Sequence, residues 1–146
     1  MRTRSFLFIL AAIVFITAFG PQAQAQTATP AWQSAGTDAA RVGTFLKTLQ
    51  DAMALENHLK VASLVKYPLE AWVNGEAITV RSDSELLSHY HQIFDKTLRQ
   101  SVAAARTEGL SATADGIAFC SGRLLVRAAS DKNASLKIVK ISEPAR

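Results

Sequence analysis

The chain has 146 residues, 49% of them hydrophobic, and its 16 basic and 12 acidic side chains give a net charge of +4. This length suits one ordinary domain with a sizeable core and excludes a second one. The single cysteine, Cys120, excludes an internal disulfide, so we expect the hydrophobic core to hold the fold together.

Residues 1–25 have the pattern of a secretory signal peptide. Two arginines precede an apolar run at 6–19, and the small-residue sequence Ala-Gln-Ala follows at 23–25. The run has about 14 residues, which fits a signal peptide and is shorter than the roughly 20 that a membrane-spanning helix needs. We therefore expect an exported protein, periplasmic or extracellular, that begins at Gln26 and has no membrane span after cleavage.

Without this leader the charge balance falls to 14 basic against 12 acidic residues, or +2. Six of the basic side chains follow residue 122 and face only two acidic ones. They are Arg123, Arg127, Lys132, Lys137, Lys140 and Arg146. Nucleic-acid binders have denser basic clusters with aromatic residues between them, so we expect no nucleic-acid partner. The segment is interpreted as a solvated strand face, with a face for anionic lipid or polymer as the alternative.

A flexible tail is predicted at 26–36, where Thr, Pro, Ala and Gln cannot bury enough apolar surface to order the chain. A single folded domain is then expected at 37–143. It begins with a helix capped by Thr37 or Asp38, because the apolar residues that follow recur three and four positions apart. They are Val42, Phe45, Leu46, Leu49 and Met53.

A shorter helix and a β-hairpin come next. The helix, at about 57–65, ends ahead of Tyr67-Pro68, because the residue before a proline leaves helical space. Its apolar residues are Leu59, Ala62 and Leu64. Two strand-forming runs, 68–73 and 76–80, flank Asn74-Gly75, the dipeptide that best accepts the two positive φ angles of a type I′ turn. The hairpin is therefore predicted to have a two-residue turn.

A long helix is predicted after the hairpin, because Ser82 and Glu85 have the spacing of a capping box. Apolar residues then continue at helical spacing. They are Leu86, Leu87, Tyr90, Ile93, Phe94, Leu98 and Val102. The pattern leaves open whether one helix runs to about Arg106 or bends near Asp95.

The rest of the chain is predicted to be β structure. Its strand-like runs are 110–114, 117–120, 123–129 and 136–141, with polar turn-forming segments between them. Ser121-Gly122 allows either a tight turn between two strands or a bulge in one bent strand. The resulting order, α-α-β-β-α-β-β-β, predicts an α+β fold with a curved, mostly antiparallel sheet packed on helices.

This order and three segments resemble small exported bacterial proteins of the nuclear transport factor 2-like superfamily, over about residues 39–141. The segments are LVKYPL at 64–69, ELLSHYHQIF at 85–94 and the glycine-bracketed strand at 116–123. The resemblance implies a cone-shaped, cystatin-like α+β fold, in which the curved sheet and the helices enclose a cavity. It also implies that sheet faces pair, so a homodimer is expected. It implies no reaction, because the superfamily hosts isomerases, dehydratases and association modules.

His91 and Asp95 are the candidate catalytic residues. Four positions apart on one predicted helix, they share a face, so the carboxylate could orient the imidazole for acid–base chemistry. The alternative is an ordinary surface pair at this spacing. No third ligand follows at a metal-binding spacing, so we expect no metal and no other cofactor.

Three aromatic residues are candidate ligand contacts, because their rings and polar tips are typical of recognition pockets. They are Tyr67, Trp72 and Tyr90. The alternative is that these rings pack between the hairpin and the long helix.

The leading hypothesis is an exported, non-enzymatic binding domain that takes a small molecule or a partner protein through the cavity or the sheet face. It depends on the resemblance and on the absence of a converging catalytic set in the sequence. The alternative is a small cavity enzyme, isomerase-like or hydrolase-like, with His91 and Asp95 as its acid–base pair. A third hypothesis is attachment to the cell envelope through the basic C-terminal strands.

Overall fold

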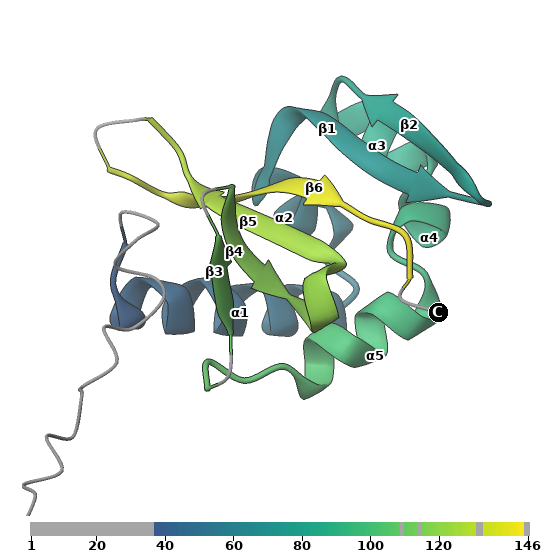
Figure 1. The fold of residues 1–146 in the computed structure, drawn as a ribbon. Coiled ribbons are helices and arrows are strands. Elements are labelled where there is room, and N and C mark those ends of the chain that lie inside the picture. The colour runs from purple at the N-terminus through teal and green to yellow at the C-terminus, as the bar shows by residue number, and fades with distance from the viewer. Residues whose placement is uncertain (1–36, 109, 114, 131–132, 145–146) are drawn as a thin grey trace, which may run out of the picture.

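The computed structural model describes residues 37–108, 110–113, 115–130 and 133–144 (Figure 1). The predicted leader at 1–25 and the predicted tail at 26–36 lie outside these residues. The elements, in chain order, are α1 (Ala39–Ala54), α2 (His58–Ser63), β1 (Val65–Val73), β2 (Glu76–Val80), α3 (Asp83–Ser88), α4 (Tyr90–Ile93), α5 (Lys96–Ala104), β3 (Ser111–Thr113), β4 (Gly116–Phe119), the 3-10 turn η2 (Cys120–Gly122), β5 (Leu124–Ala128) and β6 (Leu136–Ile141).

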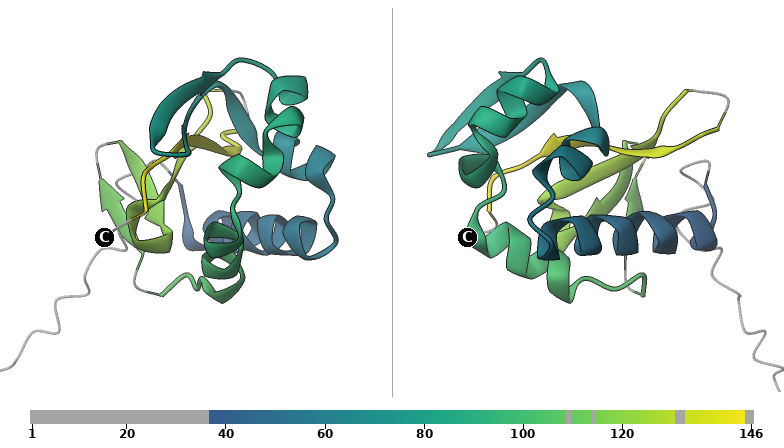
Figure 2. Two further views of the ribbon diagram at one scale, coloured as in Figure 1. Left: turned by 90° about the vertical axis from the view of Figure 1, so that its right-hand side faces the viewer. Right: turned by 180° about the vertical axis from the view of Figure 1, so that it is seen from behind.

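The six strands form one sheet in the order β2-β1-β6-β5-β4-β3. Neighbouring strands are antiparallel except β1 and β6, which are parallel. The helices lie on one face of the sheet, as the view from behind in Figure 2 shows. The predicted α+β fold with a mostly antiparallel sheet is therefore confirmed. The sheet is not strongly curled, so the cone shape is not confirmed.

The structure of α1 confirms the helix that was predicted from the sequence. Asp38 is its cap, because the Asp38 carboxylate accepts a hydrogen bond of 2.9 Å from the backbone N–H of Arg41. All five apolar residues of the predicted stripe are buried, and they pack into the single core between helices and sheet. The spacing of the apolar residues is therefore enough to define which face of α1 meets the core.

The second helix differs from the prediction at one residue. Leu59 is 69% exposed, whereas Val61 and Ala62 are buried. Residues two apart on a helix point about 200° away from each other, so burying Val61 turns Leu59 toward solvent. With only six residues, α2 has room for one buried pair and no complete apolar stripe.

The β1–β2 hairpin has the predicted two-residue turn. Val73 pairs with Glu76, and the residues between them, Asn74 and Gly75, have φ angles of 51° and 89°. Two positive φ angles define the type I′ geometry, whose twist matches that of the flanking strands. The turn places Asn74 at the tip of the hairpin, where its side chain is exposed.

The predicted long helix is three helices, α3, α4 and α5, which corrects the expected element order. Asp95 interrupts the path with an extended conformation (φ −61°, ψ 167°), and its carboxylate accepts a hydrogen bond of 2.7 Å from the backbone N–H of Leu98. Aspartate favours this capping position over a helix interior because its side chain competes for backbone N–H groups. Of the two alternatives, the bend near Asp95 is correct. The apolar residues on both sides of the break are buried, except Leu87, which is half-buried.

The strand region contains two strands where the sequence left a choice. β4 and β5 pair as an antiparallel hairpin, and the three residues of η2 between them all have positive φ angles, of 53°, 58° and 86°. The tight turn is therefore correct, and a single bent strand is wrong. The last strand, β6, lies between β5 and β1 and so occupies the middle of the sheet. Its residues Ile138 and Ile141 are among the most buried in the chain.

Gly116 should be the glycine least tolerant of a side chain. Its φ angle is 138°, and a Cβ atom there would collide with the carbonyl oxygen of Val126 on the neighbouring strand. We expect Gly116→Ala to lower the free energy of unfolding by about 3 kcal/mol, since backbone strain and overpacking add. Gly122→Ala is the matched control, because Gly122 also has a positive φ (86°) but an open site, and it should cost about 1 kcal/mol. Urea unfolding measures both, and equal losses would contradict the packing at Gly116.

Candidate functional site

An open hollow of about 610 Å³ lies where the hairpin tip, the junction of α4 and α5, and the C-terminal segment meet. We call it the Trp72 hollow. Its lining residues are Trp72, Asn74, Gly75, His91, Gln92, Asp95, Arg123, Glu143 and Pro144. In Figure 1 these elements come together at the right of the molecule, beside the end of β6.

The hollow contains three of the five candidate residues named from the sequence. Trp72, His91 and Asp95 line it, whereas Tyr67 and Tyr90 do not. It also contains Arg123, which sequence reasoning counted only as one cation of the basic C-terminal segment. A lone arginine between a turn and an apolar strand was the available signal, because such a residue needs a partner if it is buried.

Arg123 and Asp95 form a two-point ion pair across 28 residues of chain. The Nη2 and Nη1 atoms of Arg123 donate to Oδ2 and Oδ1 of Asp95 at 2.9 and 3.4 Å. The Arg123 side chain is only 6% exposed and that of Asp95 is 40% exposed. The hydrogen bonds from Arg123, with a smaller contribution from the backbone N–H of Leu98, lower the pKa of Asp95 despite its partial burial. Asp95 is therefore held in its ionised form.

Arg123 also ties the turn after β4 to the C-terminal segment. Its backbone carbonyl accepts a hydrogen bond of 2.7 Å from the backbone N–H of Ser142. The Nε atom of Arg123 is buried without a hydrogen-bond partner among the described residues. The guanidinium group thus depends on Asp95 for its polar contacts within the described part of the chain.

His91 and Asp95 line the same hollow but do not share a helix. α4 ends at Ile93 and Asp95 is extended, so the helical spacing that would align the two side chains is interrupted. Among the described residues, the exposed His91 ring instead stands edge-on to the rings of His58 and Tyr90, with centroids 5.3 and 5.4 Å away. The Asp95 carboxylate binds Arg123 and the cap of α5, and no described contact joins it to His91.

The two tyrosines lie outside the hollow and pack against other groups. Tyr90 is buried, stacks on His58 at 3.8 Å and lies 5.1 Å from the Phe94 ring, and burial raises the pKa of its phenol. The half-buried Tyr67 donates its hydroxyl hydrogen to the carbonyl of Ala62 at 3.3 Å. Burial, together with the charge of Asp83, raises the pKa of Tyr67 to about 12. Both rings therefore contribute to packing between the hairpin and the helices.

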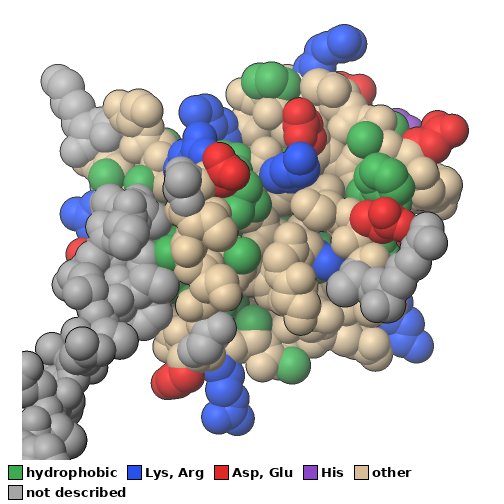
Figure 3. Space-filling model, in the orientation of Figure 1, with side chains coloured by type: hydrophobic (Ala, Val, Ile, Leu, Met, Phe, Trp, Pro, Cys, Tyr) green, Lys and Arg blue, Asp and Glu red, His purple; other side chains and the backbone are tan. Residues whose placement is uncertain are grey.

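Three of the four described basic side chains of the C-terminal segment pair with a carboxylate, and the fourth, Lys137, donates to a backbone carbonyl. Arg127 pairs with Asp115 at 3.6 Å, Lys140 pairs with Glu70 at 3.0 Å, and Lys137 donates to the carbonyl of Ser63. Figure 3 shows positive and negative side chains interspersed on this face of the molecule, with no large field of one sign. Lys132 and Arg146 lie outside the described residues.

Within the described ranges, no three side chains of His, Cys, Asp or Glu are grouped so that they could bind a metal ion. No helix in that same part of the chain is both long and apolar enough to cross a bilayer.

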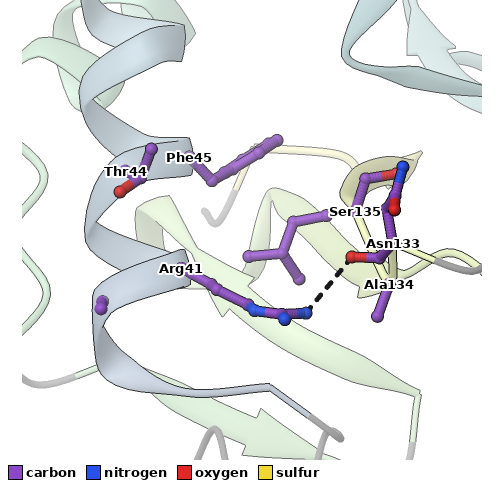
Figure 4. A pocket seen from close by; sticks show the side chains of 8 residues that line it. Arg41, Thr44, Phe45, Asn133, Ala134 and Ser135 are labelled. Atoms are coloured by element: carbon purple, nitrogen blue, oxygen red, sulfur yellow. Dashed lines mark hydrogen bonds between the residues drawn. The ribbon is translucent and has the colours of Figure 1, made fainter.

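A separate hollow, of about 460 Å³, lies far from Trp72, between the start of α1 and the segment that leads into β6 (Figure 4). Its lining is mainly apolar and includes Phe45 and Leu136. The Nη1 atom of Arg41 reaches across it and donates to the carbonyl of Asn133 at 3.3 Å. None of the candidate residues named from the sequence lines this hollow.

No protein-family model, no curated protein and no solved structure matches this chain.

The Asp95–Arg123 pair should carry measurable, pH-dependent stability. Asp95→Asn retains a good helix cap but leaves the buried Arg123 without a counter-charge. We expect the free energy of unfolding at pH 6 to fall by about 2 kcal/mol, less than for a fully buried pair because Asp95 is partly exposed. The folded pKa of Asp95 lies below its unfolded value, so this contribution is present above about pH 4 and is lost as the pH falls through the folded pKa.

Asp38→Asn is the matched control for this experiment. Asp38 also caps a helix and pairs with an arginine, Arg41 at 3.5 Å, but both side chains are more than half exposed. The control should change the free energy of unfolding by less than about 0.5 kcal/mol. Urea unfolding from pH 2.5 to 7 measures both variants. If Asp95→Asn behaved like Asp38→Asn at every pH, the ion pair would not have the assigned role.

Proposed function

We propose that this chain is an exported, non-enzymatic binding domain whose ligand site is the Trp72 hollow. The observation that carries the proposal is the convergence of Trp72, polar side chains and a fixed ion pair on one concave surface. The ligand is a small molecule or a short part of a partner protein. The volume of about 610 Å³ falls within the range of small-molecule sites.

The hollow is organised before any ligand arrives. Asp95 caps α5 and forms an ion pair with Arg123, so one wall of the hollow is held by contacts within the protein. The half-buried Trp72 belongs to β1, whose neighbours β2 and β6 hold it on both sides. Sites with walls held in this way lose less conformational entropy on binding than loops that must first become ordered.

Binding fits this geometry better than acid–base catalysis through the predicted pair. Both carboxylate oxygens of Asp95 accept hydrogen bonds from Arg123, and the lowered pKa keeps Asp95 ionised near neutral pH. A general acid or base works best with a pKa near the working pH. The enzyme with His91 and Asp95 as acid–base pair remains the second candidate, because both side chains line the hollow.

We also propose membership of the nuclear transport factor 2-like superfamily, with its cone-shaped fold. Support comes from the element order, in which two helices precede a hairpin and a further helical segment precedes the remaining strands. The sheet face opposite the helices carries no helix among the described residues, and its part over β5, β4 and β3, away from Trp72, is the proposed surface for a homodimer.

Ligand binding should be visible at the amide side chains of the hollow. In a fragment screen with ¹⁵N-labelled protein (residues 26–146), we expect hits to shift the side-chain NH₂ signals of Asn74 and Gln92. The NH₂ group of Gln50 is the internal control, because it donates to the carbonyls of Val102 and Ala105, away from the hollow. Hits that move only signals outside the hollow would contradict the site. Turnover of a cavity-sized ketosteroid or epoxide that His91→Ala abolishes would replace binding by catalysis.

Export is tested with the leader alone. Residues 1–26 placed ahead of alkaline phosphatase, which needs disulfides to be active, should give active enzyme in the periplasm of a bacterial host. Val14→Asp should block export by interrupting the apolar run, and Gln22→Asn, beyond that run, should not. Mass spectrometry of the exported full chain should show a mature protein that begins at Gln26. Enzyme activity that is equally absent with the natural and the Val14→Asp leader would contradict export.

A further inference from the structure

We infer that the ligand of the Trp72 hollow is a neutral saccharide of two or more rings, stacked on Trp72 and extending onto the open face of the sheet. This inference rests on the proposed function and adds the chemical class of the ligand. It follows from three features: a second hollow beside the first, the neutralised charges around both, and the amide groups at the rim.

The second hollow, of about 260 Å³, lies on the open sheet face over β1, β2 and the end of β6, and it shares Trp72 and Glu143 with the Trp72 hollow. Trp72 therefore stands between two concave surfaces. Its partner across the hairpin is Ala77, whose small side chain leaves space beside the indole ring. Two adjoining subsites with an aromatic ring between them suit a ligand made of linked rings.

The arginine and the lysine that line the two hollows are each paired with a carboxylate within the protein. Arg123 is bound by Asp95, and Lys140 is bound by Glu70 at 3.0 Å. An anionic ligand would have to displace one of these carboxylates to reach a lysine or arginine. Displacing Asp95 from the buried Arg123 is costly, whereas the Lys140–Glu70 pair, with side chains 49% and 67% exposed, contributes little and resists an anion only weakly. A neutral ligand leaves both pairs intact.

The remaining groups match a polyol. Asn74 and Gln92 carry exposed side-chain amides, and amides both donate and accept hydrogen bonds, as sugar hydroxyl groups do. The Oε1 atom of Gln92 lies 3.2 Å from Nδ1 of His89, so Gln92 offers chiefly its NH₂ group to a ligand. Ser142 adds a hydroxyl at the second hollow. Indole offers an apolar face to the C–H side of a sugar ring, while the amides reach the hydroxyl groups at its edge. A wholly apolar ligand would displace water from the Asn74 amide and the Gln92 NH₂ group without replacing those hydrogen bonds, which costs free energy.

The test uses residues 26–146 with Trp32→Phe, so that Trp72 is the only tryptophan. A panel of neutral disaccharides covers α- and β-linked glucose, galactose, mannose and N-acetylglucosamine. Glucuronate, spermidine and trialanine are the anionic, cationic and peptide comparisons. We expect at least one disaccharide to change Trp72 fluorescence and to shift the NH₂ signals of Asn74 and Gln92. Its affinity should change less than twofold between 20 and 500 mM salt, because a neutral ligand is not screened.

Two variants separate stacking from simple loss of fold. Trp72→Phe keeps an aromatic face and should weaken disaccharide binding less than threefold, whereas Trp72→Ala should weaken it at least tenfold. Both are measured through the NH₂ signals of Gln92. Urea unfolding checks that each variant is folded, and Lys47→Ala on the exposed side of α1 is the distant control.

Every other outcome contradicts the proposal that the ligand is a neutral saccharide. Binding of only glucuronate or spermidine, with strong salt dependence, would make the ligand an ion, and binding of only trialanine would make it a peptide. In those cases the proposed function stands and the ligand class is wrong. If fragments shift the NH₂ signals of Asn74 or Gln92 but no panel member does, the saccharide proposal is wrong and the proposed function stands. If nothing shifts them, the saccharide and the proposed function fail together.

Discussion

The ion pair between Asp95 and Arg123 joins parts of the chain that no local interaction would bring together. Asp95 starts α5, and Arg123 follows the turn between β4 and β5. The carbonyl of Arg123 then holds Ser142 at the end of the central strand. A buried guanidinium without a partner is costly, so docking α5 with Asp95 in reach of Arg123 stabilises the fold. One contact thus sets the helical layer against the sheet at this end of the molecule.

The same contact determines what the hollow can recognise. Because Asp95 and Arg123 satisfy each other, the hollow has a rigid polar wall that offers little net charge. In the proposed function, recognition falls to Trp72 and to the amides of Asn74 and Gln92, which come from the hairpin and from α4. A site of this kind selects shape and hydrogen-bond pattern, and it is insensitive to salt. The structure needed for stability and the structure proposed for binding are therefore one arrangement.

Local patterns in the sequence predicted local structure well. The stripe of α1, the Asn74-Gly75 turn and the caps at Asp38 and Ser82 all depend on residues within a few positions of each other. Periodicity also identified the buried residues around Asp95, even though it joined three helices into one. The break between α4 and α5 came from a capping preference that competes with helix continuation at Asp95. Spacing alone could not show which of the two would prevail.

The site was predictable only in part, because its geometry is long-range. Trp72, His91 and Asp95 were named for their chemistry, and they meet in space through the sheet and the helix break. Arg123 was missed because its partner lies 28 residues away and no pattern links the two. The curvature of the sheet also depends on how the helices fill the space beneath it, which strand patterns do not specify.

The most direct measurement of this account is the side-chain NMR spectrum of Arg123 in ¹⁵N-labelled protein. A guanidinium held at two points by Asp95 should give Nη signals that are separate and slow to exchange at pH 6, unlike those of the exposed Arg81. The signals should collapse toward an average in Asp95→Asn, where the two-point contact is lost. Averaged Arg123 signals in the natural protein, indistinguishable from those of Arg81, would contradict the ion pair on which the hollow depends.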